Sequence, residues 1–104
     1  MLIVLLFVWQ LSLARAEQDT HAIIIKDHKF APAQLTIPSK TKVKIFIENQ
    51  DSTPEEFESF ELNREKVVAA NGKVVIFIGP LRPGVYRFFG EFHKNTAQGQ
   101  IVVQ

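Results

Sequence analysis

The sequence predicts an all-β fold in which two sheets pack as a sandwich, and three observations support this. Short runs rich in β-branched and aromatic residues recur along the chain. Groups of glycine, proline, asparagine and aspartate separate these runs, as expected for turns. The one stretch past the N-terminal segment that allows a helical turn, residues 63–66, is too short to form a helix. Many short strands at this spacing are typical of a β-sandwich.

The predicted strands follow one another from residue 21 to the end of the chain. The clearest is 42–48, where Val43, Ile45 and Ile47 face one way, which is the pattern of a strand with one buried face. The opposite face carries Lys42, Lys44 and Glu48 together with Phe46. Proline closes the run at 35–37. The predicted strands are 21–26, 35–37, 42–48, 73–78, 85–89 and 99–104, and the turns are 49–54, 70–72 and 79–84.

The N-terminal segment predicts export. Residues 2–13 are almost entirely apolar, and Ala14-Arg15-Ala16 follows them with the small-x-small pattern of a cleavage site. The apolar run is short for a membrane span, so it indicates a signal peptide over residues 1–16 and a single domain over 17–104, located in the periplasm. An uncleaved anchor or a buried N-terminal strand is the alternative.

Charge and composition exclude several classes of function. The formal net charge is +1, and loss of Arg15 with the signal peptide leaves a neutral chain, which argues against nucleic acid or an anionic membrane as the partner. The chain has no cysteine, so no disulfide stabilises it and the core must do so, with help from any bound metal. No serine lies in a nucleophile elbow, so nothing supports a hydrolase.

An acidic segment is the first candidate site. If residues 55–61 are extended, Glu56 and Glu58 share one face, and two carboxylates at this spacing can converge on one cation. A solvated acidic edge is the alternative. Phe60 lies on the same face, and a core position for Phe60 favours a specific role for the two carboxylates. Five of the chain's eleven acidic residues lie within residues 55–65: Glu55, Glu56, Glu58, Glu61 and Glu65.

A second candidate lies near the C-terminus. Glu91 and His93 are two residues apart, which places a carboxylate and an imidazole on one side of an extended segment, and both are good metal ligands. Gly90 before them permits a tight turn. A purely structural or exposed role for His93 remains open. His28, in a charged loop, is expected to be solvent-exposed, although it could come near a site.

Aromatic residues are numerous for so short a domain, and most are expected in the core. Phe57, Phe89 and Phe92 interleave with the candidate ligands. They would either form a hydrophobic wall that tunes a metal or take part in ordinary packing.

Segments 30–38, 43–51 and 83–88, with His93, together resemble a bacterial cupredoxin over essentially the whole predicted mature chain. The resemblance implies a Greek-key β-sandwich. It also implies that the four copper-ligand positions of that family correspond here to Glu56, Gly90, His93 and Ala97. Only the histidine is kept, and because a blue copper centre needs a thiolate, such a centre is excluded.

Residues 54–59 and 89–93 more closely resemble the EfeO-type cupredoxin-like domains. That resemblance implies a periplasmic protein of high-affinity iron uptake, working with a membrane iron permease and a periplasmic iron-binding protein. It implies a metal site at a Glu-x-Glu pair, which Glu56 and Glu58 match.

The sequence therefore predicts that Glu56, Glu58, Glu91 and His93 converge on an iron or copper ion. An oxygen-rich site with one imidazole suits iron, cupric copper, manganese or zinc. Whether the protein oxidises ferrous iron or only transfers it is left open. The alternatives are a cupric copper chaperone or buffer, and a metal-free module that docks on a membrane partner through its acidic edge.

Overall fold

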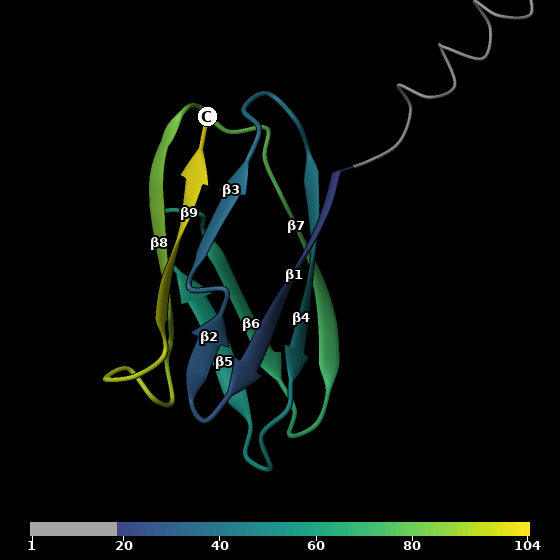
Figure 1. The fold of residues 1–104 in the computed structure, drawn as a ribbon, viewed down its shortest axis with the longest axis vertical. Coiled ribbons are helices and arrows are strands. Elements are labelled where there is room, and N and C mark those ends of the chain that lie inside the picture. The colour runs from purple at the N-terminus through teal and green to yellow at the C-terminus, as the bar shows by residue number, and fades with distance from the viewer. Residues whose placement is uncertain (1–18) are drawn as a thin grey trace, which may run out of the picture.

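The computed structural model describes residues 19–104, which form two β-sheets packed face to face (Figure 1). The predicted signal peptide, 1–16, lies outside the described residues. No helix within 19–104 is long and apolar enough to cross a membrane. The strands are β1 (Asp19–Lys26), β2 (Lys29–Ala31), β3 (Gln34–Ile37), β4 (Val43–Asn49), β5 (Glu55–Ser59), β6 (Arg64–Val68), β7 (Lys73–Ile78), β8 (Gly84–Gly90) and β9 (Gln98–Val103).

The chain crosses repeatedly between the sheets. One sheet has the strand order β2-β1-β4-β7 and the other has β3-β9-β8-β5-β6. The pairs β1–β4 and β3–β9 are parallel, and the other paired strands are antiparallel. Such neighbours are far apart in sequence, so the connections between them must pass from one sheet to the other. The predicted all-β sandwich is confirmed.

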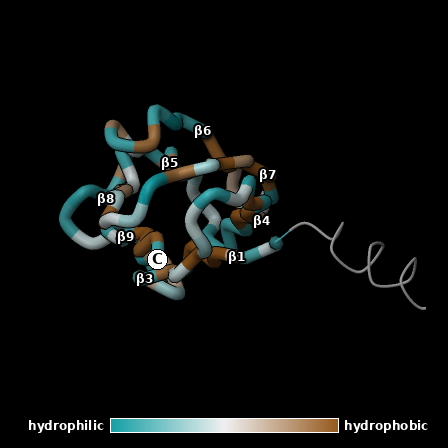
Figure 2. Tube along the Cα trace, turned by 90° about the horizontal axis from the view of Figure 1, so that it is seen from above, coloured by the Kyte–Doolittle hydropathy of each residue, from teal (hydrophilic) through white to brown (hydrophobic). Residues whose placement is uncertain are grey.

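The core lies between the sheets and is supplied by alternate residues of the strands. Val43, Ile45 and Ile47 are fully buried, as their alternation predicts. Hydrophobic residues recur along β1, β4, β7 and β9, while the peripheral loops are largely hydrophilic (Figure 2). Full burial of one such side chain contributes about 1.5–3 kcal/mol. The core residues are Ile23, Ile25, Phe30, Leu35, Ile37, Val43, Ile45, Ile47, Phe57, Leu62, Val68, Ile76, Ile78, Phe88, Ala97, Ile101 and Val103.

No helix forms at residues 63–66, as the shortness of this stretch predicts, and the region belongs to a β-hairpin. Its second strand, Arg64–Val68, pairs antiparallel with β5 in a register that places Glu65 opposite Glu58. Asn63 takes a positive φ of 53° in the connecting turn, a conformation that asparagine tolerates well. The hydroxyl of Ser59 accepts a hydrogen bond from the Leu62 amide at 3.1 Å and closes the turn.

The core position expected for Phe60 is wrong, because this side chain is 78% exposed. The inward-facing residues of β5 are Glu55, Phe57 and Ser59, and Phe60 stands just past the end of the strand. The ring of Phe57 stacks on Phe88 with 4.9 Å between centroids, so Phe57 sets which face of β5 is buried. One carboxylate, that of Glu55, is thereby drawn into the interior.

Candidate metal centre

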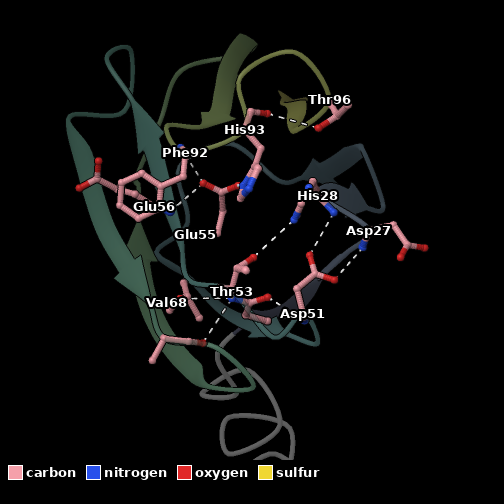
Figure 3. A network of polar contacts seen from close by, with 12 residues as sticks. Asp27, His28, Asp51, Thr53, Glu55, Glu56, Val68, Phe92, His93 and Thr96 are labelled. Atoms are coloured by element: carbon pink, nitrogen blue, oxygen red, sulfur yellow. Dashed lines mark hydrogen bonds and ion pairs between the residues drawn. The ribbon is translucent and has the colours of Figure 1, made fainter.

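The Glu55 carboxylate is 1% exposed and lies at one end of the sandwich (Figure 3). Its Oε1 accepts hydrogen bonds from the backbone amides of Glu56 and Phe92, both at 2.9 Å. Its Oε2 lies 2.7 Å from Nδ1 of His93. A buried carboxylate is costly unless it is hydrogen-bonded, and these three donors meet that requirement.

His93 lies in the loop between β8 and β9, whose backbone is closed by local hydrogen bonds. The His93 carbonyl accepts from the Ala97 amide at 2.9 Å, and the Ala97 carbonyl accepts from the Gly90 amide at 2.8 Å. The loop therefore holds the His93 ring in a defined place against Glu55. Donation from Nδ1 to the carboxylate leaves the lone pair on Nε2, the arrangement found in histidines that bind metals.

His28, expected to be solvent-exposed, is instead partly buried against His93. The two rings stack with 3.5 Å between centroids and an interplanar angle of 12°. Asp27 and His28 form the turn between β1 and β2, with positive φ values of 54° and 58°. The carboxylate of Asp51 accepts from their backbone amides at 2.8 and 3.0 Å. The hydrogen bond from the His28 amide is the main reason that the pKa of Asp51 is lowered.

A type 1 copper centre does not fit this end of the molecule. A Cβ added to Gly90 would lie 2.6 Å from Cδ of Glu55 and 2.7 Å from Cβ of Ala97. The positions that the resemblance aligns with a cysteine and a methionine therefore face space that the Glu55 carboxylate fills. The carboxylate beside His93 is that of Glu55.

The outward-facing carboxylates form a separate group on the other side of β5. Glu56 and Glu58 are half-buried, and with Glu65 of β6 they bring one ligand oxygen each within 4.8 Å of one another. Burial is the first cause that raises the pKa of Glu56, followed by a hydrogen bond and charge repulsion from Glu65. Burial and then the charge of Glu65 also raise the pKa of Glu58. We call Glu56, Glu58 and Glu65 the carboxylate cluster.

The structure divides the four residues predicted to share one site. Glu56 and Glu58 lie together. Glu91 lies near them, since its charge raises the pKa of both, but its carboxylate is 3.4 Å from Nζ of Lys94. The imidazole of His93 faces Glu55 and is outside the carboxylate cluster.

Two residues of these sites were missed in the sequence. Glu55 was counted only among the acidic residues, although Phe57 two positions later lies in phase with it and marks the buried face. Glu65 was likewise counted only among the acidic residues, and only the β5–β6 register places it opposite Glu58. The stacking of His28 on His93 depends on tertiary contacts, and no local sequence signal reports it.

The chain belongs to the cupredoxin-like domain family, whose model matches residues 1–103. An uncharacterized protein of Rickettsia prowazekii (strain Madrid E), RP394, is 51% identical over 81 residues. The match covers 78% of this chain and 65% of that protein, so the chain spans slightly less than two thirds of its relative's length.

Solved structures with the same fold include copper proteins. Auracyanin A of Chloroflexus aurantiacus, described as a "blue" copper protein, has a TM-score of 0.73 at 15% identity, covering 85% of this chain and 100% of its own. The metal-binding domain of the Cu(I)-exporting P-type ATPase CopA of Streptococcus pneumoniae D39 has a TM-score of 0.73 at 16% identity, covering 82% and 84%. A purple cupredoxin of Nitrosopumilus maritimus has a TM-score of 0.62 at 22% identity, covering 81% and 99%. These likenesses show the fold alone.

Substitution Gly90→Ala tests the close packing around Glu55. The added methyl group meets the Glu55 carboxylate and Ala97, so we expect a loss of about 1–3 kcal/mol in the free energy of unfolding, measured with urea. Asn95→Ala, in the exposed loop nearby, is the control and should change stability by less than about 0.5 kcal/mol. An unchanged unfolding midpoint for Gly90→Ala would show that the carboxylate does not occupy this space.

Substitution Glu56→Gln tests the repulsion within the carboxylate cluster. The raised pKa of Glu56 means that the folded state binds its proton more tightly than the unfolded state does, so stability falls as pH rises from the ordinary value of 4.5 through the raised one. The metal-free variant should therefore melt at a higher temperature than the wild type at pH 7, and the difference should vanish at pH 4. Glu48→Gln, which loses a contact to Lys73, should show no such gain.

Proposed function

We propose that this protein is an exported metal-binding protein whose carboxylate cluster binds iron during its uptake. The observation that carries the proposal is the convergence of Glu56, Glu58 and Glu65 on the outer face of the β5–β6 hairpin. The family assignment and the absence of cysteine agree with a cupredoxin-like protein that lacks a type 1 copper site.

The electrostatics of the carboxylate cluster favour a cation. Each carboxylate raises the energy of its ionised neighbours, and this repulsion contributes to the raised pKa values of Glu56 and Glu58. A bound cation would remove the repulsion and displace the protons. Oxygen ligands suit ferrous or ferric iron and manganese, and they disfavour cuprous copper.

The position of the carboxylate cluster suits transfer better than storage. β6 is an edge strand, and Glu65 on it is exposed, so a cation held there keeps access to solvent and to a partner. The EfeO-type resemblance of residues 54–59 and 89–93 makes iron the proposed cargo. Under this proposal residues 1–16 direct export to the periplasm, a periplasmic iron-binding protein exchanges iron with the cluster, and a membrane iron permease receives it.

We propose binding and transfer as the role of these residues, rather than oxidation. Carboxylates stabilise ferric over ferrous iron, but they do not themselves accept the electron that oxidation releases. Glu91 adds a negative charge near the carboxylate cluster, and its carboxylate also pairs with Lys94 at 3.4 Å.

A metal titration tests the proposal. We expect the wild-type protein to bind ferrous iron under anaerobic conditions and to melt at a higher temperature when iron is present. At an iron concentration of about a hundred times Kd, binding should add about 2.7 kcal/mol to the free energy of unfolding. The double variant Glu56→Ala/Glu58→Ala should lose both effects. The control Asp19→Asn/Glu48→Gln removes the same charge from the opposite sheet and should keep them.

Unchanged iron affinity in Glu56→Ala/Glu58→Ala would overturn the site assignment. Equal losses in the double variant and in its control would show that net charge, rather than the carboxylate cluster, attracts the metal. Failure of the wild-type protein to bind iron at all would overturn the proposed function.

A further inference from the structure

We propose that His28 and His93 form a second metal site, separate from the carboxylate cluster, that takes a divalent cation preferring imidazole, such as Cu²⁺ or Zn²⁺. The two rings lie at the end of the sandwich where the β1–β2 turn meets the β8–β9 loop (Figure 3). The proposal goes beyond the iron-binding role, because it uses different residues and a different ligand chemistry.

His93 is already oriented as a metal ligand. Its Nδ1 lies 2.7 Å from a carboxylate that is itself fixed by two backbone amides, so ring rotation would break a buried hydrogen bond. A carboxylate on one nitrogen of a histidine fixes the tautomer and strengthens the other nitrogen as a ligand. The His93 side chain is 25% exposed, which gives a cation access to the ring.

The backbone of His28 is held in the turn between β1 and β2. Two-residue hairpin turns with positive φ at both positions are dominated by asparagine, aspartate and glycine, and glycine is preferred at the second. Here His28 takes the second position, and Asp51 holds it there through the backbone amide. Histidine is among the residues enriched at positive φ, so this turn presents the His28 ring without requiring a glycine.

The loop that carries Asp51 is itself held in place. The buried side chain of Asn49 donates to the carbonyl of Thr53 at 2.9 Å, and its oxygen accepts from the Asp51 amide at 3.0 Å. The chain of contacts from Asn49 through Asp51 fixes the backbone of His28 against His93. Contacts from outside their own segments therefore position both residues: Asp51 holds the backbone of His28, and Glu55 holds the ring of His93.

Binding requires one movement. In parallel stacked rings the in-plane lone pairs do not converge, so the His28 ring must turn for both residues to bind one ion. Besides stacking on His93, the His28 ring lies near the Thr53 hydroxyl, which is 3.4 Å from Nε2, a long distance for a hydrogen bond of this kind. His93 is thus the anchored ligand and His28 the mobile one, with water completing the coordination.

The nearby charge also favours a cation. The Asp51 carboxylate accepts hydrogen bonds from the backbone amides of Asp27 and His28, so it lies beside the turn that carries the His28 ring. Imidazole suits copper and zinc, whereas the carboxylate cluster suits iron and manganese. The two sites would therefore separate metals by ligand class.

Copper and zinc titrations of the full protein, purified without an affinity tag, test the proposal in the Glu56→Ala/Glu58→Ala background, which disables the carboxylate cluster. We expect one Cu²⁺ to bind with two imidazole nitrogens visible in its electron paramagnetic resonance spectrum. His28→Gly should lower the affinity for Cu²⁺ and Zn²⁺ by about 10-fold or more. Removal of a ligand should cost at least as much affinity as removal of a residue that hydrogen-bonds to a ligand.

Glycine suits the positive φ of residue 28, so His28→Gly should keep its thermal stability and separate metal loss from unfolding. The control is His21→Ala, because His21 pairs with Asp19 at 2.8 Å on β1 and should not affect binding. Unchanged Cu²⁺ and Zn²⁺ affinity in His28→Gly, or loss of their binding in Glu56→Ala/Glu58→Ala alone, would overturn the imidazole site. Neither result bears on iron binding by the wild-type protein, so the two proposals fail separately.

Discussion

The contact between the buried carboxylate of Glu55 and the ring of His93 organises the functional end of this molecule. A buried charge is tolerated only with close partners, and removal of one partner leaves the other uncompensated. The Glu55 carboxylate joins β5 to the loop after β8 through two backbone amides and one imidazole. The loop and the ring of His93 take their positions from it, and the ring of His28 stacks on that of His93.

This contact also determines where metals can bind. Because the carboxylate fills the space beside Gly90 and Ala97, the interior end of the sandwich has no room for the side chains of a type 1 centre. Ligand groups remain in two places outside that space. One is the outer face of the β5–β6 hairpin, where carboxylates gather, and the other is the tip where the two imidazoles meet.

Much of the fold could be predicted from alternation, and much of the site could not. Val43, Ile45 and Ile47 reveal β4 because they are buried while Lys44 and Phe46, which stand between them, face outward. In the acidic stretch around Glu55 and Glu56 the same period of two is hidden, since charged residues stand on both faces. The meeting of His28 with His93 depends on how strands from the two sheets end together, which local patterns do not encode.

Nitrogen NMR of the His93 ring at pH 8, in metal-free protein, tests the central claim most directly, because it reports which ring nitrogen carries the proton. The structure predicts the tautomer with hydrogen on Nδ1, donated to Glu55, and a free lone pair on Nε2. Hydrogen on Nε2, or the rapidly averaged signal of an unconstrained imidazole, would contradict the account.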